Sequence, residues 1–302
     1  MRPSAFQSTI PERLLGKPFG PHGLSLVRAE LGADPGACRA ELARRVCQRL
    51  NWRSPGGAYQ FMSARVGLLR LARAGWIQLP APRNGNGNGQ PRPRAGFAQA
   101  PPAPVHLRAD WPADLLLQRV DGKTAASKTF NELIEQNHYL GYTPMAGAQV
   151  RYLIGGPTGW LGAISFGAGA WAVAARDRYI GWSAAARQAR LHLVLNNSRL
   201  LLAPGVRSPN LAARVLSRCA RRLPADFREL YGYAPVLLET FVELARFGGG
   251  CYRAANWQCV GHTQGRGKKG SRDGPGVPRK AVWVYPLHPR FRAVLRGEAP
   301  WR

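Results

Sequence analysis

The stretch PVLLETFV, at residues 235–242, has the composition of a buried strand. Most of its side chains are apolar or β-branched, and an apolar run without alternation is typical of a strand covered on both faces of a sheet. Glu239 is its one charged residue. A carboxylate in such a strand is either paired with a basic group or used in chemistry. We therefore treat Glu239 both as a candidate catalytic acid and as a buried partner of one of the many arginines.

Strand and helix patterns alternate on both sides of this stretch. Apolar, β-prone segments predict further strands at residues 149–154, 160–166, 191–202, 259–263 and 282–287. Helical patterns occupy residues 128–136, 211–223 and 252–257. In the second of these, Leu211, Val215 and Cys219 recur every four residues and are expected to face the core, after a helix start at Ser208 and Pro209. The order predicts an α/β fold, a mixed sheet with flanking helices, over residues 105–302.

A second domain is predicted before residue 84. Residues 84–104, NGNGNGQPRPRAGFAQAPPAP, are rich in Asn, Gly and Pro and are expected to form a linker. The elements expected before it are a helix at 38–50, a turn at 53–57, a second helix at 59–74 and a short strand at 76–80. Helix, tight turn, helix and strand is the order of a winged helix, which we predict for residues 1–83. A helical bundle whose arginines are only solvated is the alternative.

The charge of the chain indicates an anionic partner. It has 43 Lys and Arg against 16 Asp and Glu, a net charge of +27 at pH 7. Such an excess favours a polyphosphate, and DNA is the partner we expect. The candidate nucleic-acid contacts are Arg65, Arg70 and Arg73 of the second helix, Arg199, and Arg266, Lys268 and Lys269 of a Gly-rich basic run.

The sequence gives no sign of a membrane segment. No apolar run approaches the roughly 18–20 residues that span a bilayer, and the first residues lack the apolar centre of a signal peptide. We expect a cytoplasmic protein without membrane contact.

Polar residues near several strand ends could line a pocket. We expect Asn196, Arg199, Glu239, Tyr252 and Asn256 to lie around it. The catalytic candidates are Glu239, Tyr252, His138 and Asn256. Phosphodiester chemistry needs a nucleophile such as a tyrosine, or a metal held by carboxylates. Glu239, Glu243 and His138 could hold Mg²⁺ or Mn²⁺ if the fold brings them together, although a tyrosine or an asparagine at such positions more often packs or caps.

Eight short segments, in order, resemble the DruA family of Druantia anti-phage proteins. They are NHYLGY (137–142), GWLGA (159–163), DRYIGW (177–182), NNSR (196–199), PNLA (209–212), LETFV (238–242), CYRAANW (251–257) and TQGRG (263–267). The resemblance covers almost the whole chain. It implies a role in phage defence or on mobile DNA, with other defence-system subunits as partners, and it implies no particular reaction.

The order of strands and helices also resembles the acyltransferase-like fold of the GNAT superfamily. In that fold, backbone N–H groups at the start of a helix bind the cofactor pyrophosphate. The corresponding loop here would be residues 203–210, and Pro209 removes one N–H donor from it. We therefore expect the scaffold without acetyl-coenzyme A.

Two functions follow from these observations. The first is a DNA-binding protein of the DruA type, in anti-phage defence or mobile-element biology. The alternative is an enzyme that nicks, cleaves or transfers strands of nucleic acid at a pocket around Glu239 and Tyr252. Binding that leaves DNA unchanged favours the first, whereas products that depend on Mg²⁺ or Mn²⁺ favour the second.

Overall fold

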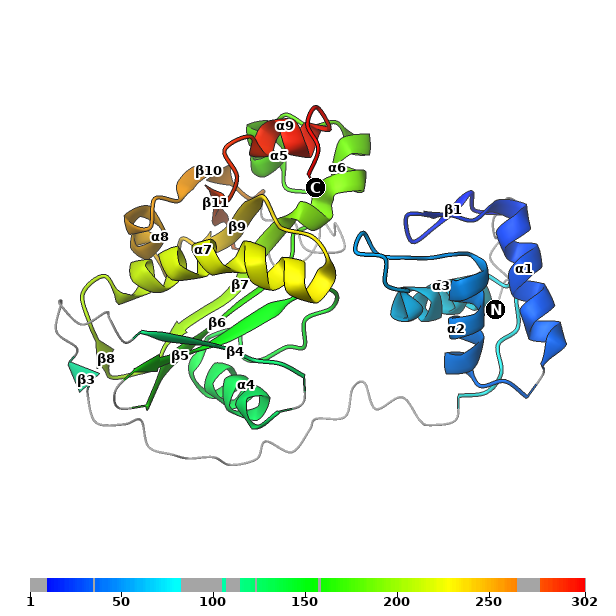
Figure 1. Cartoon of the computed structure of the whole chain (residues 1–302), viewed down its shortest axis with the longest axis horizontal. Helices are drawn as coiled ribbons and strands as arrows, with labels where there is room; N and C mark the ends of the chain where they lie inside the picture. The colour runs from blue at the N-terminus through cyan, green and yellow to red at the C-terminus, as the bar shows by residue number, and fades with distance from the viewer. Residues whose placement is uncertain are drawn as a thin grey trace. The chain divides into compact units, whose positions relative to one another are not determined.

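The chain divides into two compact units, Met1–Ala95 and Gly96–Arg302 (Figure 1). The computed structural model describes residues 10–34, 36–82, 105–106, 115–122, 124–156, 159–264 and 278–301. The predicted linker, residues 84–104, lies outside these ranges, as do Arg266, Lys268 and Lys269 of the basic run. No helix in the described ranges is long and apolar enough to cross a membrane.

Three helices and a small hairpin form the described part of the first unit. The hairpin pairs β1 (Arg13–Leu14) with β2 (Lys17–Pro18), and it precedes α1 (Gly20–Ala33), α2 (Arg39–Arg49) and α3 (Phe61–Arg73). Leu42 and Val46 of α2 share a buried core with Leu68 and Leu71 of α3. The two helices predicted from periodicity are therefore present, with their ends shifted by one or two residues.

The short strand predicted at residues 76–80 is wrong. These residues form no strand, and Trp76, Ile77 and Leu79 are half-buried against the helices instead. A strand must pair its backbone N–H and C=O groups with a neighbour. In the described part of this unit, the pairing outside the hairpin is a single bridge between Arg53 and Tyr59. The described unit is thus three helices with a hairpin before the first helix, and it shows no wing after the last.

A seven-stranded mixed sheet forms the centre of the second unit. The strands are β4 (Leu116–Arg119), β5 (Val150–Gly156), β6 (Gly159–Ala168), β7 (Val194–Leu202), β9 (Leu237–Glu243), β10 (Gln258–His262) and β11 (Lys280–Pro286). Their order is β10-β11-β9-β7-β6-β5-β4, and β7 and β9 are the one parallel pair in it. A separate pair, β3 (Val105–His106) with β8 (Val206–Arg207), is also parallel. The predicted mixed sheet is confirmed.

Helices pack on both faces of this sheet. They are α4 (Ala125–Asn137), α5 (Ala174–Ile180), α6 (Ala184–Arg190), α7 (Leu211–Tyr231), α8 (Gly250–Ala254) and α9 (Phe291–Arg296). Tyr152 of β5 belongs to the hydrophobic cluster that packs under α7, whereas the next residue, Leu153, belongs to the cluster that packs under α4. Because successive side chains of a strand point to opposite faces, α7 and α4 cover opposite faces (Figure 1).

The long helix α7 has the predicted buried residues, but both of its ends differ from the prediction. Leu211, Val215 and Cys219 are buried as expected. The helix does not end near residue 223 but continues through Pro224 to Tyr231. Ser208 does not cap it, because the residue before the helix is Asn210, in a left-handed conformation with φ 58°.

Strands β7 and β9 separate after a short paired stretch. They pair only over Val194 to Asn196 of β7 and Leu237 to Glu239 of β9, although β7 continues to Leu202 and β9 to Glu243. The sheet is therefore split between their C-terminal halves. This split of the sheet positions the candidate site.

Candidate functional site

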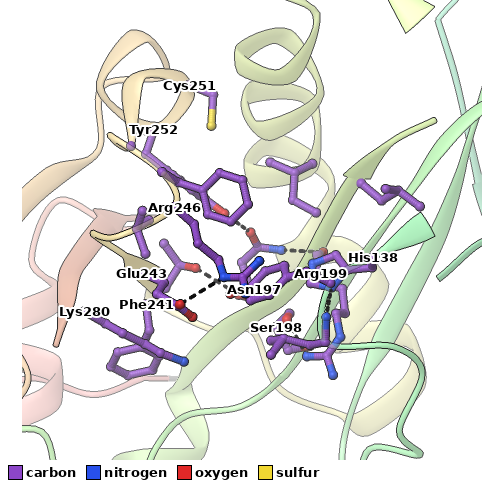
Figure 2. Close-up of a pocket in the computed structure, with 18 of the residues that line it drawn as sticks. His138, Asn197, Ser198, Arg199, Phe241, Glu243, Arg246, Cys251, Tyr252 and Lys280 are labelled. Atoms are coloured by element: carbon purple, nitrogen blue, oxygen red, sulfur yellow. Dashed lines mark hydrogen bonds and ion pairs between the residues drawn. The ribbon is translucent and has the colours of Figure 1, made fainter. Parts of the chain in front are cut away.

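A pocket of 760 Å³ lies where β7 and β9 diverge (Figure 2). Residues 196–202 of β7 and 240–243 of β9 form two of its walls. The end of α4, at residues 137–140, and the segment 246–252 line the rest of it, together with Lys280 of β11. The pocket brings together His138, Arg199 and Tyr252, three of the candidate site residues predicted from the sequence.

A buried network fixes Tyr252 at this pocket. Its hydroxyl donates to Asn197 Oδ1 at 2.7 Å (Figure 2), and Asn197 Nδ2 donates to the carbonyls of Ser165 and Arg199 at 3.0 Å each. Thr240 Oγ1 donates to the Asn197 carbonyl at 3.0 Å. Burial raises the pKa of Tyr252 above its ordinary value. The candidate nucleophile is therefore a neutral, buried donor that connects α8 with β7.

Glu239 does not line the pocket. Its carboxylate accepts hydrogen bonds from the Ala170 N–H at 2.6 Å and from Arg176 Nη1 at 2.8 Å. Both side chains of this ion pair are fully buried, and Asp177 accepts from Arg176 Nη2 at 2.8 Å. Burial raises the pKa of the Glu239 carboxyl, while Arg176 and the Ala170 N–H oppose that rise. Of the two interpretations of Glu239, the buried ion pair is the one that the structure contains.

The predicted metal ligands are not brought together. Glu243 lines the pocket, and its Oε1 lies 3.1 Å from Arg246 Nε. His138 lines the pocket too, but Glu239 is bound to Arg176 outside it. Within the described ranges, no group of three or more His, Cys, Asp or Glu side chains could hold a metal ion.

The two predicted asparagines occupy different environments. Asn256 is exposed just after α8, with φ 62°, which is a turn conformation that Asn tolerates. Asn196 lines the pocket, and its Oδ1 is buried without a hydrogen-bond partner among the described residues. The residue that bonds to Tyr252 is its neighbour Asn197, so the sequence located the segment but not the side chain.

Arg199 and His138 provide the polar side of the pocket. Arg199 Nε donates to the Gly141 carbonyl at 3.1 Å and Nη1 to the Ser198 carbonyl at 2.8 Å. No carboxylate in the described part of the chain forms an ion pair with it. Burial lowers the pKa of Arg199, but a guanidinium stays charged at neutral pH.

The imidazole of His138 is neutral beside this cation. Burial and, to a lesser extent, Arg199 lower its pKa to about 4. Its Nδ1 accepts from the Leu140 N–H at 3.2 Å. In a neutral imidazole the hydrogen then lies on Nε2, so the ring offers a donor and not a free base.

Aromatic rings gather at the edge of this pocket. Tyr139 and Phe247 are 39% and 49% exposed, and their ring centroids are 5.4 Å apart. The guanidinium of Arg246 lies 5.1 Å from the Tyr139 ring centre. Sequence reasoning missed these residues and Lys280. The aromatic neighbour of His138 and the pair Arg246-Phe247 before three glycines were the signals that could have found them.

One of those glycines is required by geometry. Gly249 has φ 70°, and a Cβ placed there would lie 2.8 Å from the Trp283 ring. It directly precedes α8, so this close approach places Cys251 and Tyr252 at the pocket.

The arginines of α2 and those of α3 differ in their pairing. On α2, Arg44 and Arg45 pair with Glu41, Arg45 also pairs with Asp34, and Arg49 pairs with Glu30. On α3, the candidates Arg65, Arg70 and Arg73 are all exposed, and none forms an ion pair with another described residue. The fold therefore neutralises Arg44, Arg45 and Arg49 of α2 and leaves the arginines of α3 as unpaired charge.

Comparison with known proteins identifies a family for the second unit. The family model for the Druantia protein DruA matches residues 95–274, which contain every pocket residue except Lys280. No curated protein matches the chain. A solved chimera of the spermidine N-acetyltransferase SpeG from Vibrio cholerae and hSSAT is similar over 57% of this chain and 95% of its own, with 11% identity and a TM-score of 0.37, a likeness too weak to inform on ligand or reaction. The chain belongs to the Druantia protein DruA family, which implies a component of a Druantia anti-phage system.

Proposed function

We propose that this DruA protein binds duplex DNA through the exposed face of α3. The observation that carries the proposal is the set of three exposed arginines on this helix that no carboxylate in the described ranges neutralises. The net charge of +27 supplies the long-range attraction that a polyanion needs.

The distribution of side chains around α3 fits a helix lying in a groove. Ala64, Gly67, Leu68 and Leu71 are buried and define its inner face. With about 100° between successive residues, Met62 and Val66 fall near the middle of the outer face. They are 68% and 43% exposed.

Arg65 and Arg70 fall on the two sides of this outer face. A helix in the major groove turns its centre to the base edges and its flanks to the phosphates. Apolar side chains at the centre can contact thymine methyl groups, and arginines at the flanks can contact phosphate oxygens. Exposed apolar groups bordered by unpaired cations therefore complement the bases and the phosphates of duplex DNA.

The salt dependence of binding tests this proposal. The full-length chain would be titrated onto a short labelled duplex, with anisotropy recorded between about 50 and 200 mM salt. We expect the logarithm of the association constant to fall linearly with the logarithm of salt, by roughly 0.9 for each phosphate neutralised. Affinity that does not change with salt would contradict the proposal.

The enzymatic alternative is tested on the same complexes. After incubation with Mg²⁺ or Mn²⁺, a denaturing gel shows whether strands have been nicked, cleaved or joined. The DNA-binding proposal expects unchanged strands. Metal-dependent products would support the alternative, and Glu243 and His138 would then be the first pocket residues to replace.

A further inference from the structure

We infer that the pocket between β7 and β9 binds a nucleoside phosphate, with the phosphate at Arg199 and the base against Phe247 and Tyr139. The ligand is either a free nucleotide or one unpaired nucleotide of a strand, because both present the same aromatic base and the same anion. This site lies in the second unit and does not depend on duplex binding by α3.

The charge inside the pocket favours a phosphate. Arg199, Arg246 and Lys280 line it, and Glu243, the one carboxylate among its lining residues, is already bound to Arg246. Arg199 is half-buried and bonded only to backbone carbonyls within the described part of the chain. Carbonyl dipoles orient a guanidinium without neutralising it, so an anion entering the pocket would gain a charge-assisted interaction with a group that is already in place.

His138 strengthens this preference without adding charge. Its ring stacks on Tyr139, with centroids 4.9 Å apart, and its Nδ1 is occupied by the Leu140 N–H. The remaining ring nitrogen carries a hydrogen that can be donated to a ligand oxygen. A neutral donor beside a cation is suited to an oxyanion at neutral pH.

The apolar side of the pocket favours a flat ring. Phe247 and Tyr139 remain 49% and 39% exposed, and Leu140, which also lines the pocket, is 46% exposed. Exposed aromatic side chains at a basic pocket are the usual platform on which bases stack, because every base has a π-face. The volume of 760 Å³ lies within the range of about 300–1,000 Å³ found for small-molecule sites.

The structure does not favour coenzyme A in the same split of the sheet. The loop at 203–210 contributes no residue to the pocket lining. The N–H groups of Ala203, Val206 and Leu211 already donate to protein carbonyls, and Pro209 has none. None of these four residues therefore offers a free N–H group to a pyrophosphate.

Titration calorimetry on the full-length chain tests the site with dAMP, a short oligo-dA strand and inorganic phosphate. We expect dAMP or the strand to bind more tightly than phosphate. Phe247→Ala should weaken that binding about tenfold, since stacking contributes on that order. Trp171→Ala is the matched control, because Trp171 is 60% exposed and does not line the pocket.

The phosphate contact is tested by Arg199→Lys, with Arg246→Ala as a second variant if the first lowers thermal stability. Loss of affinity for dAMP in either folded variant supports the inference, and Arg65→Ala on α3 should leave dAMP binding unchanged. Tight binding of dAMP alone identifies a free nucleotide, and binding of oligo-dA that depends on Phe247 identifies a nucleotide of a strand. Equal affinity for phosphate and dAMP without dependence on Phe247, or no binding of either nucleotide probe, would overturn it.

Discussion

Arg176 and Arg199 are two arginines of one sheet unit with opposite surroundings. Arg176 is fully buried, and Glu239 and Asp177 both bind its guanidinium. Arg199 is half-buried, and its hydrogen bonds within the described part of the chain go to two backbone carbonyls. The first cation is neutralised by the fold, which makes it structural. The second is oriented but not neutralised, and this leaves its charge for a ligand.

The same difference separates two neighbouring helices of the first unit. Arg44, Arg45 and Arg49 of α2 pair with Glu30, Asp34 and Glu41, whereas Arg65 and Arg70 of α3 pair with no acid among the described residues. Net charge alone does not distinguish these groups, because both helices are basic in sequence. Pairing within the fold distinguishes them, and the following predictions test whether that criterion separates stability from binding.

The largest effect is expected at the neutralised cluster. Glu239→Ala leaves Arg176 buried beside only Asp177, and breaking a buried ion pair typically costs about 3–5 kcal/mol. We expect the free energy of unfolding, measured with urea, to fall by that amount. The double variant Glu239→Leu with Arg176→Met removes both charges and should recover much of the loss. A Glu239→Ala protein of native stability that loses function would instead support the catalytic interpretation.

A smaller loss of stability is expected at Tyr252. Tyr252→Phe removes the hydroxyl that donates to Asn197 Oδ1 and leaves a buried acceptor without its donor. Such a change costs about 1–3 kcal/mol, which urea unfolding can resolve. Binding of DNA and of dAMP should remain. A variant with unaltered stability whose strand cleavage disappears would show that Tyr252 is a nucleophile.

The pH dependence of stability should report on the pocket. The pKa of His138 is lowered from 6.5 to about 4, first by burial and then by Arg199. Between those values the unfolded chain binds a proton that the folded chain does not, so stability falls as the pH decreases through this range and is constant above it. His138→Gln should reduce the loss by about 1 kcal/mol near pH 5, a value discounted for partial exposure.

Replacing the cation nearest to this histidine sharpens the test. Arg199→Ala should raise the pKa of His138 toward its ordinary value of 6.5, which narrows the pH range over which stability is lost and makes the total loss smaller. An unfolding free energy with the same pH profile in the wild type and in His138→Gln would mean that this histidine is not held neutral by the pocket.

Much of the fold could be predicted because local patterns are strong in its centre. The run at 235–242 is a buried strand, and the four-residue spacing from Leu211 to Cys219 places α7 correctly. The failures occur where tertiary structure decides. Trp76 to Leu79 have no strand to pair with among the described residues, and β10, which lies at the edge of the sheet, has no buried residue.

The site was harder to predict, because its partners are distant in sequence. Arg176 reaches Glu239 across 63 positions, and Tyr252 reaches Asn197 across 55. Periodicity can state that a carboxylate is buried, but it cannot choose its arginine among many. Phe247 lies in a segment with no periodic pattern, and its place at the pocket depends on the split between β7 and β9.

A matched pair of single substitutions distinguishes the unpaired arginines of α3 from the paired arginines of α2. Arg65→Ala on α3 and Arg44→Ala on α2 each remove one exposed arginine from the same unit, and Glu41 keeps Arg45 when Arg44 is lost. Duplex affinity of the full-length chain would be measured for both variants across a salt series. We expect Arg65→Ala to weaken binding and to reduce the salt slope by about one, while Arg44→Ala behaves like the wild type. Equal losses in the two variants would show that affinity follows net charge rather than the unpaired arginines of α3, and would contradict the account.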